Sequence, residues 1–147
     1  MTQRTNEEAV RSYAVALASG NQDELALLRH RDWTAEWPQS GERVRGHARA
    51  LEADAAYPGG RPSVRPDRMI GSEDRWVVTP IYSLQRIVGS GDSWWADGTV
   101  AYPDGSTWHL AMLLELRDGQ ILRETSYFAE PFEAPAWRQP FAERIGG

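Results

Sequence analysis

Patterns typical of helices occupy the first part of this chain, and patterns typical of strands follow them. Helical spacing of apolar residues occurs three times before residue 57. From residue 63 to residue 129 the chain instead has five apolar segments, separated by the stretches SEDR, GSGD, YPDG and RDG. Such stretches are typical of hairpin turns, so the segments predict an antiparallel meander. Helices followed by one sheet indicate an α+β fold, and 147 residues suffice for one domain with one core.

Capping residues mark the ends of the predicted helices. A capping box that starts at Thr5 begins the first helix, and Gly20 ends it. Asn21 begins a short second helix, which we expect to end within residues 29–32. A third helix is predicted over residues 47–56, before the stretch YPGG. The apolar side of this third helix carries Ala48, Leu51 and Ala55.

Two other segments complete the expected organisation. Residues 33–37 have an extended pattern, and Pro38, which lacks an N–H group, ends this strand or places it at a sheet edge. Residues 130–147 are rich in proline and aromatic residues, which predicts that they pack as an ordered extended arm at the end of a single domain spanning residues 1–147. The alternative for this tail is disorder.

Composition limits the partners and the chemistry. The net charge of −5 comes from 16 basic and 21 acidic residues without a long run of one sign, so neither nucleic acid nor an anionic membrane is expected as a partner. The chain has no cysteine, which excludes disulfides and thiolate chemistry. A polar N-terminus and the lack of a membrane-length apolar run predict a cytoplasmic location. Seven tryptophans, each with an N–H group to satisfy, suit a protein with a cavity.

Three stretches carry a resemblance to a known family: ALASGNQDEL at residues 16–25, Gly46 before the third helix, and DGQI at residues 118–121. In these stretches and in its order of elements, the chain resembles the nuclear transport factor 2-like superfamily, in particular its SnoaL-like, polyketide cyclase-like members. The resemblance implies a cone in which three helices pack in a curved antiparallel sheet, with an apolar cavity at the wide end. It also implies a homodimer joined through the sheet. The superfamily contains cyclases, isomerases, dehydratases, epoxide hydrolases and members without catalysis, so the resemblance does not fix a reaction.

Ketosteroid isomerase gives the sharpest comparison within this superfamily. Its mechanism needs a tyrosine and a protonated aspartate as donors, together with a carboxylate base. The position of the tyrosine matches Tyr13 here. The position of the base matches Trp37, and the position of the second donor matches Met112. Steroid-type isomerisation by that mechanism is therefore excluded.

The last predicted strand offers a replacement acid, Glu124. Alternate residues of a strand share a face, and the comparison puts Leu122, Glu124, Ser126 and Phe128 on the cavity side. A carboxyl group among Trp37, Met112 and Phe128 would lose hydration, which would raise its pKa toward neutrality and suit a general acid or base.

A structural role for Glu124 is the competing interpretation. The carboxyl group could form an ion pair with Arg123, Arg86 or Arg138, or face solvent after a register shift of one residue. Pairing with Arg138 would anchor the C-terminal arm.

Other strands supply further candidates. Trp76 and Tyr82 share a face of one strand, where the hydroxyl group of Tyr82 could bind a substrate oxygen or simply belong to the core. Leu110 and Met112 face inward on the next strand but one, which turns His109 outward or to a dimer contact. Asp97 has no assigned face, because Gly98 can disturb the alternation; if inward, it could share a proton with Glu124.

The sequence therefore predicts a tryptophan-lined pocket for a small apolar or aromatic molecule. The leading hypothesis is cofactor-free acid/base chemistry of cyclase, isomerase or lyase type on a carbonyl-containing metabolite, with Glu124 as proton shuttle and with Tyr13 and Tyr82 as hydrogen-bond donors. The rival is a non-catalytic ligand-binding or protein-interaction domain. No cofactor or metal is predicted, because phosphate loops and metal-ligand spacings are missing from the sequence. The predicted ligand-binding residues are Trp37, Trp76, Asp97, Leu110, Met112, Ser126 and Phe128.

Overall fold

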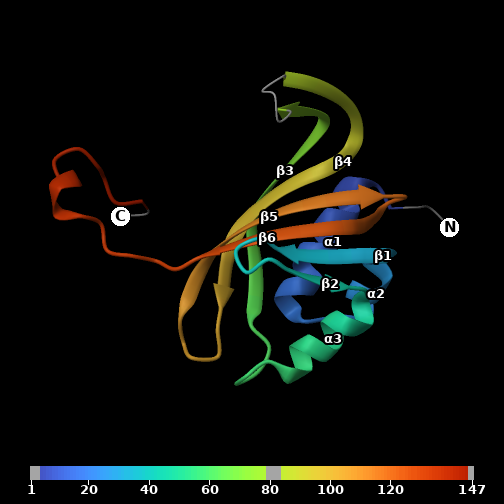
Figure 1. Ribbon diagram of the computed structural model, residues 1–147, viewed down its shortest axis with the longest axis horizontal. Helices are drawn as coiled ribbons and strands as arrows, with labels where there is room; N and C mark the ends of the chain where they lie inside the picture. Colours follow the sequence, from blue (N-terminus) through green and yellow to red (C-terminus); the bar gives the residue numbers. More distant parts are fainter. Residues whose placement is uncertain (1–3, 79–83, 146–147) are drawn as a thin grey trace.

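The computed structural model describes residues 4–78 and 84–145, with the backbone alone for residues 72–78 and 84–91. Within this part of the chain, three α-helices, six strands and one short 3-10 helix follow one another. The α+β class is confirmed. The elements are α1 (Asn6–Ser19), α2 (Gln22–Leu28), β1 (Arg29–Trp37), β2 (Glu42–Arg45), α3 (His47–Ala56), β3 (Ser63–Val78), β4 (Leu84–Ala101), β5 (Thr107–Arg117), β6 (Gln120–Ala129) and the 3-10 helix η1 (Ala136–Arg138) (Figure 1).

Helices α1 and α2 begin at the capping residues that the sequence predicts, and α1 ends at Gly20 as expected. Thr5 and Glu8 form a reciprocal capping box at the start of α1, and Gly20 ends that helix in the left-handed conformation at φ 70°. The side chain of Asn21 accepts a hydrogen bond from the backbone N–H of Glu24 at the start of α2. The expectation for residues 29–32 is wrong, because β1 begins at Arg29, directly after α2.

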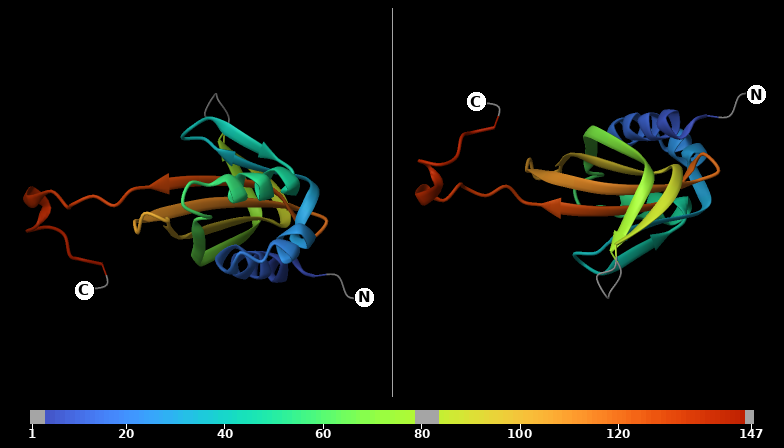
Figure 2. Two further views of the ribbon diagram at one scale, coloured as in Figure 1. Left: turned by 90° about the horizontal axis from the view of Figure 1, so that it is seen from below. Right: turned by 90° about the horizontal axis from the view of Figure 1, so that it is seen from above.

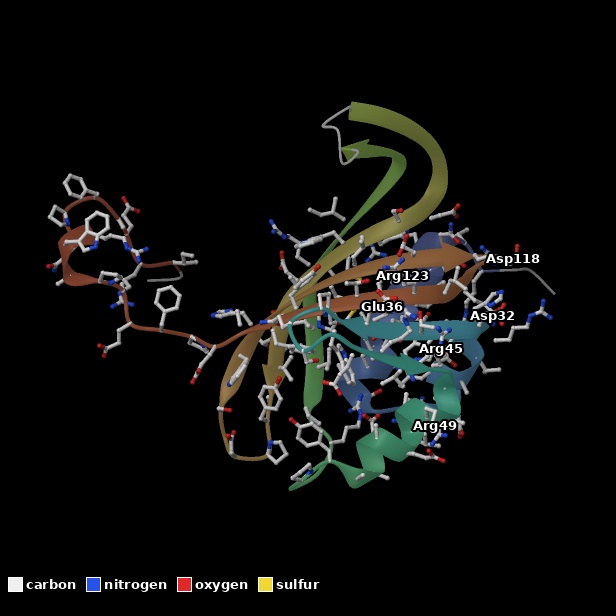
Figure 3. The ribbon with its side chains drawn as sticks, in the orientation of Figure 1. Asp32, Glu36, Arg45, Arg49, Asp118 and Arg123 are labelled. Atoms are coloured by element: carbon white, nitrogen blue, oxygen red, sulfur yellow. The ribbon has the colours of Figure 1, made fainter. Side chains whose placement is uncertain are left out.

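The six strands form one sheet in the order β2-β1-β6-β5-β4-β3. The pairs from β3 to β6 are antiparallel, as the meander predicts, but β1 lies parallel to β6. The sheet is therefore mixed and not purely antiparallel. The neighbouring positions of β1 and β6 also bring Glu36 within 2.8 Å of Arg123 (Figure 3).

Two predicted turns lie inside long strands. SEDR belongs to β3 and GSGD to β4, and these strands pair with each other from Ser63 opposite Ala101 to Val78 opposite Leu84. A bulge between Ser72 and Asp74 absorbs the irregular sequence. Gly98 lets the two strands approach closely, since a Cβ atom there would lie 2.0 Å from the carbonyl oxygen of Arg65. Figure 1 shows β3 and β4 bending together beyond the other strands.

The core lies between the sheet and the helices. Helix α1 contacts β3, β4 and β6, and its residues Val10 and Tyr13 are fully buried. None of the helices within the described residues has the length and apolar character needed to cross a bilayer.

The C-terminal arm projects from the end of β6, away from the rest of the molecule (Figures 1 and 2). Phe132, Trp137 and Phe141 are between 72% and 83% exposed. The arm therefore does not pack on the body of its own chain, which corrects the expectation that it packs.

Candidate active site

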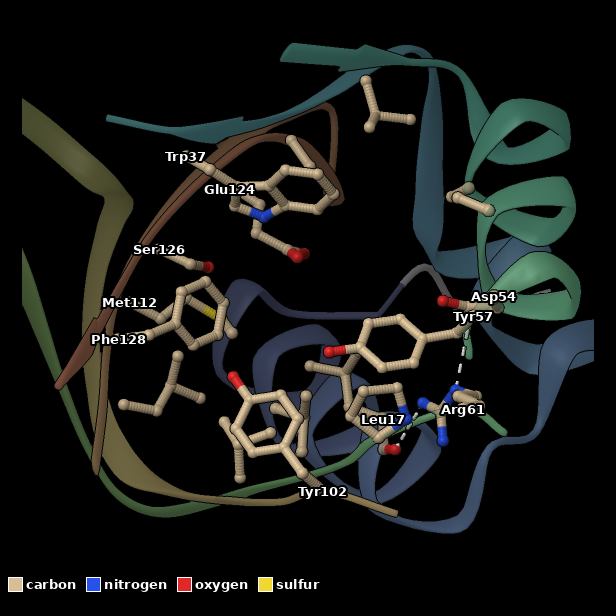
Figure 4. Close-up of a pocket in the computed structure, with 18 of the residues that line it drawn as sticks. Leu17, Trp37, Asp54, Tyr57, Arg61, Tyr102, Met112, Glu124, Ser126 and Phe128 are labelled. Carbon is tan, nitrogen blue, oxygen red and sulfur yellow. Dashed lines mark hydrogen bonds and ion pairs between the residues drawn. The ribbon is translucent and has the colours of Figure 1, made fainter. Parts of the chain in front are cut away.

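A cavity of about 280 Å³ lies on the inner side of the sheet, and its walls come from α1, α3, the strands and the segment between α3 and β3 (Figure 4). Most of the wall is apolar. The apolar lining residues are Leu17, Trp33, Ala35, Trp37, Val44, Ala50, Ala53, Pro62, Val64, Val100, Leu110, Met112 and Phe128. The polar lining residues are Arg29, Asp54, Tyr57, Arg61, Tyr102, Glu124 and Ser126.

Strand alternation places several predicted residues on this wall. Leu110 and Met112 of β5 line the cavity, and Glu124, Ser126 and Phe128 of β6 lie beside them. Trp37 joins them from β1, and Figure 4 shows its ring close to Glu124.

The expected inward position of Leu122 is wrong. A shift in the pairing of β5 with β6, between Glu115 and Leu116, breaks the alternation near the start of β6. Ile121 is fully buried there instead of Leu122, and Leu122 is only partly buried.

Glu124 is buried and belongs to a short chain of polar contacts. The side chain of Glu124 is 7% exposed, and its Oε1 accepts a hydrogen bond from the hydroxyl group of Tyr13. The oxygen of Tyr13 in turn accepts a bond of 2.9 Å from Nε of Arg29. The Nη1 atom of Arg29 lies 3.0 Å from Nδ1 of His47, the first residue of α3.

These contacts and the low polarity of the walls set the protonation of the cluster. Burial raises the pKa of Glu124, and Asp54 adds to that effect, while Arg29 and the bond from Tyr13 oppose it. Burial raises the pKa of Tyr13 well above its usual value, so this phenol keeps its proton. Burial, with the charge of Arg29, lowers the pKa of His47.

A second polar cluster lies across the cavity from Glu124. Asp54 of α3 forms an ion pair of 3.4 Å with Arg61, and it accepts a bond of 3.3 Å from the amide of Gln22. Arg61 also donates to the carbonyl oxygen of Leu17 at 2.7 Å. Figure 4 shows Asp54 and Arg61 on one side of the cavity and Glu124 on the other.

Comparison with known proteins bears on the fold. No family model matches the sequence, and no relative is found among curated proteins. Solved structures do match. An NTF2-like protein of unknown function from Burkholderia xenovorans is 27% identical, with a TM-score of 0.65 over 96% of this chain and 95% of that one. A candidate ketosteroid isomerase from Kribbella flavida is 24% identical, with a TM-score of 0.66 over 97% and 90% of the two chains.

A candidate polyketide cyclase from Pseudomonas putida is 20% identical, with a TM-score of 0.51 over 84% of this chain and 91% of that one. The chain has the fold of the nuclear transport factor 2-like superfamily. The resemblance predicted from the sequence is confirmed.

Within this NTF2-like fold, Tyr13 contacts Glu124 but does not line the cavity, which corrects its expected role as a donor to the substrate. Trp76 and Tyr82 lie outside the residues whose side chains are described. Asp97 does not line the cavity, which corrects the expectation that it could face Glu124. It lies opposite Ala111, on the other face of the sheet from Met112, and forms an ion pair of 2.6 Å with Arg68.

The structural alternatives for Glu124 are also resolved in part. Arg123 pairs with Glu36 and Glu115 on the other side of β6. Arg138 lies in the C-terminal arm, where its guanidinium stacks on the ring of Trp137. Neither arginine holds Glu124, and Arg86 is outside the described side chains.

Sequence reasoning missed several residues of the NTF2-like cavity. Arg29 was assigned to a helix end, and nothing in its neighbourhood along the chain indicates its contact with Tyr13. On α3, the cavity side carries Ala50, Ala53 and Asp54, so the expected apolar side is wrong. Leu51, on that expected side, is 44% exposed.

The tyrosines at the mouth were missed as well. Figure 4 shows the hydroxyl groups of Tyr57 and Tyr102 directed into the cavity, and their rings stack with centroids 6.4 Å apart. Within the described residues, no group of three or more potential ligands could hold a metal ion.

Proposed function

We propose that this protein binds a small apolar or aromatic carbonyl-containing molecule in the cavity and acts on it by cofactor-free acid/base chemistry of cyclase, isomerase or lyase type. The observation that carries this proposal is Glu124, a buried carboxyl group on an apolar wall whose hydrogen-bond partner is a neutral phenol. The candidate isomerase and the candidate cyclase of the same fold support this class of reaction by analogy.

Glu124 is the proton shuttle in this proposal. Burial raises its pKa, which favours the protonated acid and makes the carboxylate a stronger base. The carboxylate takes a proton from the carbon next to the ligand's carbonyl group, and the acid returns it to another atom of the ligand. Tyr13 does not line the cavity and donates to Glu124, so it positions the carboxyl group instead of binding the substrate.

Tyr57 and Tyr102 take the role of donors to the ligand oxygen. Their hydroxyl groups point into the cavity, and burial raises the pKa of Tyr102, which keeps its proton available for donation. The same role for Tyr82 stays a prediction.

Deuterium exchange tests the acid/base chemistry. Small aromatic ketones are incubated with the protein in heavy water, and mass spectrometry measures deuterium at the carbon next to the carbonyl group. We expect wild-type protein to accelerate the exchange and Glu124→Gln to abolish the acceleration. Asp97→Asn, which removes an acid on the other face, is the matched control and should retain it. Exchange by Glu124→Gln at the wild-type rate would contradict the proposal.

The rival function is ligand binding without catalysis. It is favoured by one observation: Glu124, Tyr13 and Arg29 are hydrogen-bonded to one another in a chain, as they would be in a purely structural cluster. Mass spectrometry of small molecules that copurify with the protein separates the two functions. A bound metabolite that the protein releases unchanged would support the rival.

The outer face of the sheet supports the predicted homodimer. Ile70, Trp95, Leu113 and Tyr127 are between 37% and 53% exposed on neighbouring strands, and Trp95 pairs in register with both Ile70 and Leu113. Such a patch is typical of an interface. We expect a dimer in sedimentation experiments and a monomer for Leu113→Arg. The conical shape and the cytoplasmic location stay predictions.

A further inference from the structure

Arg29 is a buried cation whose hydrogen-bond partners, Tyr13 and His47, are neutral. The residue is 8% exposed and lines the cavity. Its Nε donates to the phenol of Tyr13. A guanidinium group has donors only, so Nδ1 of His47 must accept from Nη1, and the imidazole is neutral in this arrangement. The guanidinium carbon also lies 4.0 Å from the centroid of the Trp33 ring, which stabilises the charge without neutralising it.

No carboxylate contacts this cation directly. Within the described part of the chain, Arg29 forms no ion pair, and Tyr13 stands between it and Glu124. The Nη2 atom of Arg29 has no hydrogen-bond partner among the described residues. This atom is not fully enclosed by the protein. Since Arg29 lines the cavity, Nη2 is the donor that remains for a ligand.

The charges on the cavity wall do not cancel when Glu124 is protonated. The ionisable lining residues besides the tyrosines are Arg29, Asp54, Arg61 and Glu124. Asp54 and Arg61 neutralise each other as an ion pair. A protonated Glu124 then leaves Arg29 as an uncompensated positive charge beside an apolar space, where an anion gains more than it would in water.

We propose that Arg29 forms an anion subsite and that the ligand is an organic anion, a carboxylate or an enolate on an apolar or aromatic body, whose charged oxygen accepts from Nη2 of Arg29. The inference rests on the cavity of the proposed function being the ligand site, and it names the class of molecule that the site takes. It does not require turnover.

The subsite also assigns an order to the proton transfers. The positive charge of Arg29 would stabilise both a ligand anion and an ionised Glu124, so the two negative charges compete for it. By linkage, a bound anion favours the protonated form of Glu124, and a protonated Glu124 favours the anion. An anionic ligand therefore meets Glu124 as an acid, whereas the carboxylate form takes the first proton from a neutral ketone. Tyr13, Asp54 and Arg61, which also face this region, do not remove that coupling, because the phenol is neutral and the other two form an ion pair.

Matched pairs of ligands test the subsite. Benzoate, 2-naphthoate and 4-biphenylcarboxylate are compared with the corresponding amides, which keep the shape and lack the charge. Calorimetry at neutral pH measures the affinities, with acetate as an anion without an apolar body. We expect at least one carboxylate to bind about tenfold or more tightly than its amide, and acetate to bind far more weakly than that carboxylate. Equal affinity for each acid and its amide, or no binding by any pair, would overturn the subsite.

Substitutions test whether Arg29 causes the preference for the carboxylate over the amide. Arg29→Gln should abolish the preference for the carboxylate, and Arg29→Lys should retain part of it. Arg68→Gln, which removes an arginine on the outer face, should leave it unchanged. A preference that persists in a folded Arg29→Gln protein would contradict the assignment.

A measurement of proton uptake on ligand binding tests the subsite even if the Arg29 variants do not fold. Calorimetry of the wild-type protein in two buffers of different ionisation enthalpy should show proton uptake on binding of the carboxylate and none for the amide. Glu124→Gln should abolish the uptake, and an uptake that persists in this variant would overturn the coupling. If the protein prefers anions but does not accelerate deuterium exchange, the subsite is supported and the proposed catalysis is wrong. If it accelerates the exchange but does not prefer anions, the catalysis is supported and the subsite is wrong.

Discussion

Glu124 and Asp54 are two carboxyl groups on the wall of one cavity, and they differ in what holds them. Glu124 is 7% exposed and receives a hydrogen bond from a phenol that keeps its proton. The side chain of Asp54 is 36% exposed and pairs with the permanent cation of Arg61. The hydrogen bond from Tyr13 is a neutral contact, whereas the guanidinium of Arg61 carries a charge opposite to that of the Asp54 carboxylate. The two acids therefore differ both in burial and in the charge of their partner.

The largest expected effect comes from removing the phenol that distinguishes the two acids. Tyr13→Phe takes a donor from Glu124 and an acceptor from Nε of Arg29, both of which are buried. We expect the free energy of unfolding in urea to fall by about 2–3 kcal/mol, because two buried polar groups lose a partner. Tyr127→Phe, at a tyrosine 46% exposed on the outer face, is the control and should change it very little. Equal effects of the two variants would show that the buried bonds do not stabilise the fold.

The pH dependence of stability should distinguish Glu124 next. The pKa of Glu124 in the folded protein is raised above its ordinary value of 4.5. The folded state then holds this proton more tightly than the unfolded state does. The stability from this group is complete below the unfolded pKa and is lost as the pH rises through the folded pKa.

Glu124→Gln cannot lose a proton, so the variant should gain stability relative to the wild type as the pH rises above about 4.5. Each unit of pKa difference corresponds to about 1.4 kcal/mol. Urea unfolding of both proteins at several pH values measures the difference, from which titrations common to both proteins, including that of His47, cancel. A difference that does not change with pH would mean that Glu124 does not titrate as a buried acid.

A smaller effect is expected for the ion pair of Asp54. Because Arg61 and Asp54 are 23% and 36% exposed, water screens their attraction. A double-mutant cycle of Asp54→Asn and Arg61→Gln should give a coupling free energy of about 0.5–1 kcal/mol, which falls as salt is added. Coupling that is insensitive to salt would place this pair in the same dry environment as Glu124 and remove the contrast between the two acids.

How well the sequence predicts an interaction depends on how far apart along the chain the interacting residues lie. Helix caps depend on residues three or four apart, so Thr5 and Asn21 mark their helices correctly. Alternation within one strand is equally local, and it places Met112 and Ser126 on the inner face. The parallel pairing of β1 with β6 joins segments more than 80 residues apart, and no local pattern encodes it.

The candidate site depends on the same long-range packing. Arg29 reaches Tyr13 and His47 only because the turn from α2 into β1 brings three elements together. Turn-like residues within β3 and β4 were misleading for a related reason, since a bulge and Gly98 accommodate them inside a bent pair of strands. On α3, alanines occur on more than one side, so the sequence does not identify the side that faces the cavity.

The smallest effect is expected for a third acid, Asp97, which has a cationic partner like Asp54 but lies outside the cavity. Its pair with Arg68 has side chains that are 36% and 67% exposed. Asp97→Asn should therefore lower the free energy of unfolding by less than about 0.5 kcal/mol, and it should leave the affinity for 2-naphthoate unchanged. Asp54→Asn keeps a similar shape but leaves Arg61 unpaired on the cavity wall, so it should strengthen the binding of the same carboxylate. If Asp97→Asn and Asp54→Asn change the affinity equally, the charge balance of the cavity does not select the ligand. The acids inside and outside the cavity would then differ only in their burial.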